Sequence, residues 1–364
     1  MALNPSAISR LYVRATNWLG DAVMSLPAVR AIRQIFPHAW LAVVARPSLV
    51  DLYARESVID RVIPCPVPPA PGRGRNTPWR AFRARLEFAD LLRGLHFDCA
   101  ILLQNAFDAA FMACLAGVPE RIGYRRDGRG PLLTRAIAVP EPGEIPRHER
   151  FYYLELLKRV GLLESFPRSE VIRLEGIEAA RESGLRRLAA MGVTGPTVGI
   201  SPGAAYGNAK RWLPERFAEA GSALRPSTVL LFGSPSERDL CETVAASIGR
   251  AADVRNLAGR TTLGEFIDLA AACRLFLTND SGAMHVASAL GVPTVAIFGA
   301  TDDTTTGPTG PLARVVREHA ECSPCLLRDC PIDHRCMTRV PAGRVVAAAT
   351  ELLEDPLWTQ EARF

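Results

Sequence analysis

The stretch 275-LFLTNDSGAMHVASALGVPTVAIFG-299 decides the fold class of this chain. Its two short apolar runs, Leu275–Thr278 and Thr294–Phe298, predict buried strands. Residues Ser281–Leu290 between them predict a helix. A strand, a helix and a second strand in this order are typical of a parallel α/β sheet.

The same alternation extends outward over most of the chain. In the first half, apolar runs predict strands at 11–15, 41–45 and 100–103. Helical patterns, including 23–35 and 80–93, lie between them. A second alternating run begins at Thr197–Ile200 and ends with a helix at 342–353. The sequence therefore predicts two α/β halves joined near residues 165–195, with a ligand site at the carboxyl ends of the strands.

Composition excludes several classes of protein. The chain has 364 residues, of which 48% are hydrophobic and 22% charged, as expected of a globular protein of about two domains. Nine cysteines are too few for a disulfide scaffold of this length. The sequence has no apolar run of about 18 residues, so no membrane-spanning helix is expected. Arg10 and Arg14 interrupt any N-terminal signal sequence, and we expect a cytoplasmic protein.

The net charge of +5 is a mild excess of 43 basic over 38 acidic side chains. An excess of this size does not predict a nucleic-acid partner. It suits an anionic substrate or an anionic membrane surface.

The turn from Thr278 to His285 is the strongest candidate for a binding site. It joins a strand to a helix, and the free backbone N–H groups at the helix start predict an anion site around Asp280, Ser281 and Gly282. The alternative is an ordinary turn in which Asp280 or Ser281 caps the helix and His285 belongs to the core.

A second candidate loop, residues 201–212, follows the first strand of the second half. Gly203 and Gly207 permit close approach of a ligand to the backbone, and Lys210 with Arg211 supplies positive charge. The alternative is a solvated surface loop, and the order of residues is not that of a P-loop. Two such loops in one half favour a nucleoside diphosphate site.

The third candidate is the junction 17–21, which also lies between a strand and a helix. Asp21 stands at the head of the helix, where a carboxylate is stabilised by the helix dipole. Capping is one interpretation of this residue. The other is a general base that acts on a sugar hydroxyl.

Four segments together identify a family. They are GDAVMSLPAVRAIR at 20–33, RIGYRRDGRG at 121–130, PGAAYGNAKRWLPERF at 202–217 and TNDSGAMHVASALGVPTVAIFG at 278–299. In this order they resemble glycosyltransferase family nine, the ADP-heptose:lipopolysaccharide heptosyltransferases, and most closely the heptosyltransferase II branch. The resemblance covers about residues 10–355.

The resemblance implies a GT-B fold, in which two Rossmann-like domains face each other across a cleft. It implies an acceptor-binding domain at 1–170, with a C-terminal helix at about 342–364 packing back on it. A nucleotide-sugar-binding domain at 171–341 would include a cysteine-rich segment at 322–336.

The resemblance also implies an activity, the inverting transfer of L-glycero-D-manno-heptose from ADP-heptose to the heptosylated Kdo-lipid A inner core. By position, Asp21 matches the base and Lys210 the residue that neutralises the diphosphate. The residues that match the donor site are Gly203, Glu237 (for the adenosine ribose), Asp280, Ser281, Gly282 and His285. The reaction would need no cofactor. The alternatives are a same-fold transferase with another nucleotide sugar or acceptor, and an inactive glycan- or nucleotide-binding protein.

Two groups of arginines are candidates for binding anionic partners. Arginine pairs with carboxylates and phosphates in bidentate geometry, so we expect the lipid A-core acceptor to contact Arg121, Arg125 and Arg126. A second group lies between Arg73 and Arg85, beside Trp79 and Phe82, and suits peripheral contact with the cytoplasmic face of the inner membrane. The alternative for each group is a solvated surface.

The last candidate is a set of four cysteines, Cys322, Cys325, Cys330 and Cys336. Four thiolates this close in sequence could hold a structural zinc ion, with His334 as an alternative ligand. An iron–sulfur cluster, a disulfide pair and reduced, loosely clustered thiols are the other interpretations.

Overall fold

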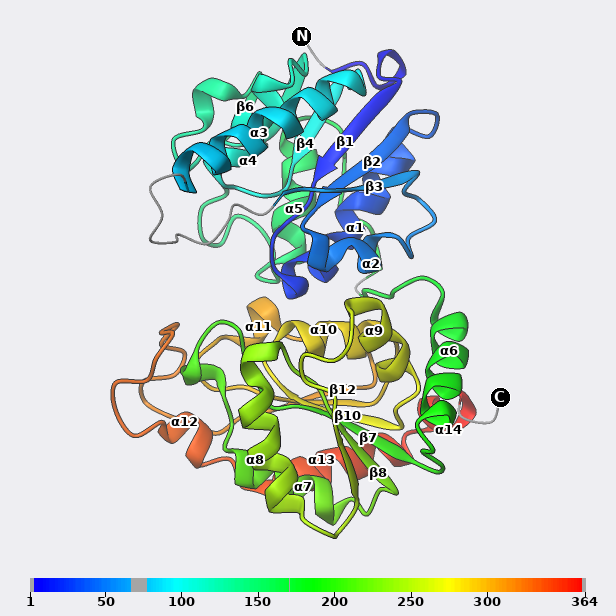
Figure 1. Ribbon diagram of the computed structural model, residues 1–364. Coiled ribbons are helices and arrows are strands. Elements are labelled where there is room, and N and C mark those ends of the chain that lie inside the picture. The colour runs from blue at the N-terminus through cyan, green and yellow to red at the C-terminus, as the bar shows by residue number, and fades with distance from the viewer. Residues whose placement is uncertain (1–2, 67–76, 170, 362–364) are drawn as a thin grey trace. The chain divides into compact units, whose positions relative to one another are not determined.

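The computed structural model (Figure 1) describes residues 3–66, 77–169 and 171–361. Arg73 and Arg75 therefore lie outside the described residues. The chain divides into a first unit, Met1–Arg168, and a second unit, Ser169–Phe364. None of the helices within the described ranges is long and apolar enough to cross a membrane.

The first unit contains a parallel sheet of six strands with helices on both faces (Figure 1). The strands are β1 (Arg10–Arg14), β2 (Trp40–Ala45), β3 (Arg61–Pro64), β4 (Cys99–Leu102), β5 (Glu120–Tyr124) and β6 (Arg135–Ile137). The helices are α1 (Leu19–Ile35), α2 (Val50–Tyr53), α3 (Thr77–Gly94), α4 (Phe107–Leu115) and α5 (Arg150–Arg159). Among them, α1 packs against α5, and α3 packs against α4.

The second unit contains another parallel sheet of six strands. They are β7 (Thr197–Ser201), β8 (Thr228–Leu231), β9 (Asp253–Asn256), β10 (Leu275–Asn279), β11 (Thr294–Ile297) and β12 (Ala313–Val316). The longer helices are α6 (Ile177–Ala190), α7 (Pro214–Ala223), α8 (Arg238–Ile248), α9 (Leu263–Ala271), α10 (Gly282–Ala289) and α13 (Ala342–Glu354). The shorter ones are the 3-10 turns η4 (Asn208–Lys210) and η5 (Pro235–Glu237), and α11 (Asp303–Thr306), α12 (Arg335–Thr338) and α14 (Pro356–Glu361).

Both sheets have the same strand order. The first runs β3-β2-β1-β4-β5-β6, and the second runs β9-β8-β7-β10-β11-β12. In each sheet the order of connection reverses between the two central strands, which are β1 and β4 in one and β7 and β10 in the other. Ligands of open α/β sheets bind at the carboxyl ends of such strands. The prediction of an α/β fold with two Rossmann-like domains is confirmed.

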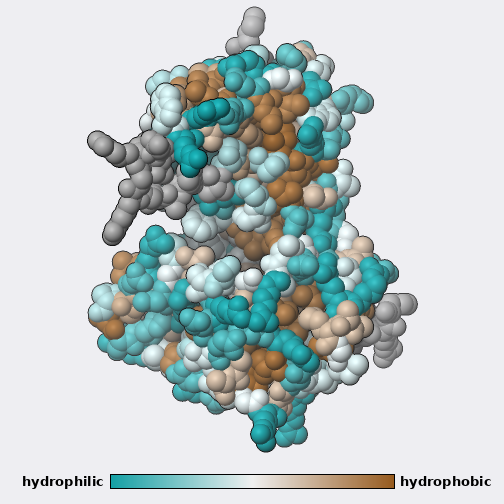
Figure 2. Space-filling view, viewed as in Figure 1, coloured by the Kyte–Doolittle hydropathy of each residue, from teal (hydrophilic) through white to brown (hydrophobic). Residues whose placement is uncertain are grey.

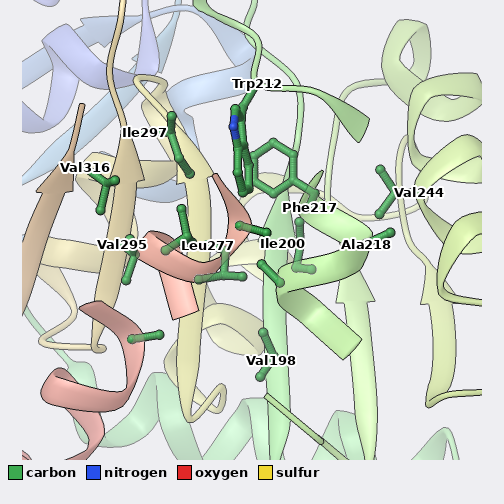
Figure 3. Packing of buried hydrophobic residues seen from close by; sticks show 14 of the residues in the cluster. Val198, Ile200, Trp212, Phe217, Ala218, Val244, Leu277, Val295, Ile297 and Val316 are labelled. Carbon is green, nitrogen blue, oxygen red and sulfur yellow. The ribbon is translucent and has the colours of Figure 1, made fainter. Parts of the chain in front are cut away.

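The central strands form because their side chains are apolar on both faces, as a sheet covered by helices requires. Every residue of β4, β7 and β10 is buried. In the second unit the core gathers around Trp212 and Phe217, which pack edge to face above Ile200 and Leu277 (Figure 3). The indole N–H of Trp212 donates to the carbonyl of Val340 at 3.1 Å, so this large side chain is buried without losing its hydrogen bond.

Helix α13 belongs to the second unit, and this corrects the sequence-based assignment of its residues. We grouped 342–364 with the first domain, but α13 packs against α7, β11 and β12. The reason is its apolar face, because Val345, Ala349 and Leu352 are fully buried in the core of the second sheet. Leaving that face exposed would cost about 1.5–3 kcal/mol for each large side chain.

Candidate active site

The second unit has a buried ion pair where its strand order reverses. Lys210 lies in η4, in the loop after β7, and Asp280 directly follows β10. The Lys210 Nζ lies 2.6 Å from the Asp280 Oδ2, and the two side chains are only 13% and 4% exposed. Thr301, which lies beyond the end of β11, donates its hydroxyl to the same Oδ2 at 2.6 Å. Three loops from neighbouring strands therefore meet at one carboxylate.

Asn279, the last residue of β10, ties the two central loops together. Its Oδ1 accepts the backbone N–H of Trp212 at 2.9 Å, and its Nδ2 donates to the carbonyl of Pro202 at 2.7 Å. The side chain is fully buried, so these bonds are not exchanged with water. Sequence analysis missed this role, although a polar residue at the end of a buried strand is a usable signal.

The turn after β10 presents the start of a helix to the same place. Ser281 is extended and stands at the N-cap of α10, and its side chain makes no capping bond. Its hydroxyl instead lies 3.1 Å from that of Thr278. The N–H groups of the first turn, beginning at Gly282, therefore have no side-chain cap, as an anion site requires. His285 is buried in the next part of α10.

Gly203 and Glu237 are neighbours, although they lie on different loops. A Cβ atom on Gly203 would lie 2.0 Å from the Glu237 Oε1, so no larger residue fits there without movement. The Oε2 of Glu237 accepts the backbone N–H and the hydroxyl of Ser234, each at 2.8 Å. Glu237 is thus held in a capping box at the start of η5, and one oxygen is directed at the loop that carries Lys210.

The cysteine-rich segment 322–336 is hydrogen-bonded to the loop that carries Lys210. The hydroxyl of Tyr206 donates to the carbonyl of Leu326 at 2.7 Å, and the Oδ1 of Asn208 accepts the N–H of Cys330 at 3.0 Å. The N–H of Ala209 donates to the carbonyl of Arg328 at 3.0 Å. The segment therefore acts as a clamp on η4.

Two cations share the ring of Tyr206. The Lys210 Nζ lies 4.9 Å and the guanidinium of Arg328 5.7 Å from its centroid. Cations near an aromatic face are attracted by its quadrupole. The arrangement keeps two positive charges at the edge of the site.

The structure does not arrange the four cysteines as a metal site, so the zinc interpretation stays a prediction. Within the part of the chain that the structure describes, no three His, Cys, Asp or Glu side chains are placed to hold a metal ion. Cys336 packs into the core against the position of Gly299, whereas Cys322 is exposed. Burial, together with the charges of the other three cysteines, raises the pKa of Cys336 to about 11. That thiol is therefore a protonated core residue.

In the first unit, Asp21 occupies the first turn of α1, after β1. It is one of a group of ionisable side chains where α1 packs against α5. Burial raises the pKa of Glu149, at the N-cap of α5, to about 7, and the charge of Asp21 adds to the effect while Arg126 opposes it. Burial also raises the pKa of Tyr153, and Asp21 contributes again. Sequence analysis missed Glu149, which only the packing of two helices brings to Asp21.

The predicted acceptor arginines are not brought together as a set. Arg125 and Arg126 are exposed beyond the end of β5. A hydrogen bond to Tyr152 raises the pKa of Arg126. Arg121 lies at the beginning of β5, where its guanidinium donates to the carbonyl of Leu132 at 2.7 Å and to that of Val118 at 2.5 Å. Those bonds give Arg121 a structural role in the strand.

Arg129 is a buried cation that the structure adds to this region. Its guanidinium donates to the carbonyl of Tyr124 at 2.8 Å and to the Oδ1 of Asn105 at 3.0 Å. Asn105 in turn donates to the hydroxyl of Tyr152 at 2.9 Å. Burial lowers the pKa of Arg129 to about 10. This network fixes the loop after β4 beside the residues that follow β5.

Comparison with known proteins gives a consistent result. A model of glycosyltransferase family 9 (heptosyltransferase) matches residues 85–335. The chain is 30% identical to lipopolysaccharide heptosyltransferase 2 of Escherichia coli over 315 residues, 85% of this chain and 88% of that protein. The protein of the same name from Salmonella typhimurium is 31% identical over 313 residues, with the same coverage. The structure of E. coli ADP-heptose LPS heptosyltransferase II matches with a TM-score of 0.79 and 28% identity, over 94% of this chain and 98% of that chain.

The family model covers most of the chain, including both central loops of the second unit and the cysteine-rich segment except Cys336. The relatives extend the match over the first unit as well, since they cover 85% of the chain. The buried pair at the switch point and these matches lead to one conclusion: this chain is a glycosyltransferase and belongs to glycosyltransferase family 9, the heptosyltransferases.

Proposed function

We propose that this chain transfers L-glycero-D-manno-heptose from ADP-heptose to the heptosylated Kdo-lipid A inner core of lipopolysaccharide. The observation that carries the proposal is the buried Lys210–Asp280 pair beside the uncapped start of α10. A relative with 28% identity is named as an ADP-heptose heptosyltransferase, which supports the donor. The relatives named heptosyltransferase 2 support the acceptor step.

The second unit would bind the donor. The ammonium of Lys210 and the N–H groups at the start of α10 are the positive groups that a diphosphate needs. Asp280 and Tyr206 hold Lys210 in place, and Glu237 would accept a hydrogen bond from the adenosine ribose. Negative charge grows on the diphosphate as the sugar leaves, so these groups bind the transition state more strongly than the ground state. No metal is required in this scheme.

The first unit would bind the acceptor and supply the base. Asp21 takes the proton of the acceptor hydroxyl, whose oxygen bonds to C1 of the heptose. The bond between C1 and the phosphate oxygen breaks, and its electron pair leaves with ADP. A single displacement of this kind inverts the anomeric centre. Arg125 and Arg126 are exposed for the carboxylates and phosphates of the inner core. Because lipid A is anchored in a bilayer, the enzyme would work at the cytoplasmic face of the inner membrane.

ADP release from ADP-L-glycero-β-D-manno-heptose tests the proposal in three arms: without acceptor, with Kdo-lipid A, and with heptosyl-Kdo-lipid A. We expect release only with the heptosylated acceptor. Release with Kdo-lipid A would assign the first transfer instead. No release in any arm, from protein shown to be folded by circular dichroism, would contradict the proposed donor and acceptor. The anomeric configuration of the product, measured by NMR, tests inversion.

A further inference from the structure

The first unit exposes aromatic side chains at the start of two helices. In α3, Trp79 is 71% and Phe82 40% exposed, and their rings stack with centroids 5.9 Å apart. In α4, Phe107 is 48% exposed and stacks on Phe111, also at 5.9 Å. We call these four residues the aromatic patch. Isolated exposed apolar residues are normal, but a group of stacked aromatic rings marks a surface that meets an apolar partner.

The two aromatic pairs belong to one surface. Helix α3 packs against α4, and the guanidinium of Arg85 lies 2.6 Å from the carboxylate of Asp108. Arg85 follows Phe82 by one helical turn, and Asp108 is the neighbour of Phe107. This ion pair therefore joins the middle of α3 to the beginning of α4.

The position of the aromatic patch relates it to the acceptor. Helix α4 begins just after β4, at the carboxyl edge of the first sheet. Asp21 follows β1, the neighbour of β4, at the same edge. The patch thus lies on the edge of the first unit where the acceptor hydroxyl would react.

The basic side chains near the aromatic patch indicate that its partner is anionic. Helix α3 carries four arginines, at 80, 83, 85 and 93, against two acidic residues, Glu87 and Asp90. Arg80 and Arg83 are exposed beside the stacked pair, and Arg83 forms an ion pair with Glu87 on that surface. Arg85 and Arg93 are paired with Asp108 and Asp90. In Figure 2, brown and teal side chains are mixed on the face of the first unit along which α3 runs in Figure 1. Aromatic rings next to basic side chains are typical of helices that lie in the interface of an anionic bilayer.

We propose that the aromatic patch, with Arg80 and Arg83, docks the first unit onto an anionic phospholipid surface. Trp79 and Phe82 would enter the interface between headgroups and acyl chains, and the arginines would contact lipid phosphates. The inference rests on the proposed function, because a lipid-anchored acceptor gives the enzyme a reason to dock. It goes further by naming the docking surface and the lipid charge that it selects.

Vesicle sedimentation tests the docking. We expect the protein to sediment with vesicles of phosphatidylglycerol and phosphatidylethanolamine, and at least tenfold less with phosphatidylcholine vesicles. The double variant Trp79→Ser/Phe82→Ser should bind the anionic vesicles at least tenfold more weakly, because the apolar contact is lost. The control is Leu185→Ser in the second unit. It removes an apolar residue whose exposure, 51%, lies between those of Trp79 and Phe82, and it should not affect binding.

Three results would overturn the docking proposal: native-like sedimentation of the double variant, an equal loss in the Leu185→Ser control, or equal binding to neutral vesicles. Transfer to a water-soluble, deacylated acceptor separates the two proposals. We expect the double variant to keep the native rate on that acceptor and to lose rate on vesicle-borne acceptor. A native protein that binds anionic vesicles but transfers no heptose would refute the proposed function alone.

Discussion

Lys210 and Asp280 lie 70 residues apart in the sequence, and the fold buries them as a pair. Two charges removed from water stabilise each other only while both are present, because a lone buried charge costs several kcal/mol. Thr301 and Tyr206 hold the two side chains in this geometry. If Lys210 binds the donor as proposed, substitutions of the pair separate its contribution to stability from its contribution to donor binding.

We expect Lys210→Ala to lower kcat/KM by about 10²–10³, because a positive group aimed at the leaving diphosphate is lost. It should also lower the free energy of unfolding by about 3 kcal/mol, since Asp280 then lacks its partner. Steady-state kinetics and urea unfolding measure the two losses. The double variant Lys210→Ala/Asp280→Ala should recover stability but not activity. Recovery of both would remove Lys210 from the donor site.

Glu149 should make the free energy of unfolding depend on pH, and its raised pKa determines the direction of that dependence. Its pKa in the folded protein is about 7, above the ordinary 4.5, because burial disfavours the ionised form. Deprotonation therefore costs stability, and the cost is absent below pH 4.5 and complete above pH 7. We expect Glu149→Gln to gain up to about 3 kcal/mol over the native protein at pH 8 and nothing near pH 4.

Urea unfolding between pH 4 and pH 8 measures this gain. Glu144→Gln is a control of opposite sign, because the ion pair with Arg159 lowers the pKa of Glu144 and its removal should cost stability at neutral pH. A constant difference between Glu149→Gln and the native protein across the pH range would show that Glu149 is not titrating in this environment.

At the scale of elements, the loop that carries Lys210 depends on the segment 322–336. The side chains of Tyr206 and Asn208 and the backbone N–H of Ala209 bond to this segment, at Leu326, Cys330 and Arg328. A loop is mobile by default, and contacts of this kind give it one conformation. The cysteine-rich segment therefore has a physical role that requires no metal, which is to position Lys210.

We expect Gly207→Ala to loosen this contact, because its Cβ would lie 2.1 Å from the carbonyl oxygen of Arg328. The KM for the donor should rise about tenfold or more, and proteolysis within 322–336 should become faster. Gly343→Ala is the matched control. It lies in α13 with nothing within 4 Å of the new Cβ, and should gain about 0.5–1 kcal/mol without a change in KM. Native kinetics for Gly207→Ala would argue against positioning by the segment.

At the scale of the whole molecule, two units of the same topology carry different chemistry. Both sheets reverse their order between two central strands. The second unit places cationic and N–H groups there, whereas the first places Asp21 and Glu149 near one another. Under the proposed function, charge complementarity would assign the anionic donor to the second unit. The acceptor hydroxyl, which must lose a proton, would be assigned to the first.

This division predicts that Asp21→Asn separates turnover from donor binding. We expect kcat to fall by about 10²–10⁴, because the base is lost, while the affinity for ADP changes less than twofold. Isothermal titration measures the affinity for ADP, and single-turnover kinetics measure the rate of transfer. The stability loss should stay within about 1 kcal/mol, the value of a carboxylate at a helix start. A parallel loss of ADP affinity and rate would place Asp21 at the donor rather than at the acceptor.

The sequence alone determined the fold class, because the central strands are continuous apolar runs that only a covered parallel sheet accommodates. It also indicated the loops at 201–212 and 278–285, since glycine, charge and a strand–helix junction are local signals. It did not indicate β3 and β9 at the sheet edges, because both are short and expose part of their residues, so neither contains an apolar run. Nor did the sequence assign α13 to the second unit, because the apolar pattern of a helix does not indicate which of two sheets the helix packs on.

Only the tertiary structure decided which distant groups meet. Segments far apart in the chain are joined by the pairing of Lys210 with Asp280, by the approach of Glu149 to Asp21 and by the contacts of 322–336 with the Lys210 loop. It also showed that Cys336 is a core residue and that the guanidinium of Arg121 is hydrogen-bonded to the carbonyl of Leu132. The physical reason is the same in each case: local patterns reveal which backbone a residue prefers, whereas its partners and its burial depend on how the elements pack.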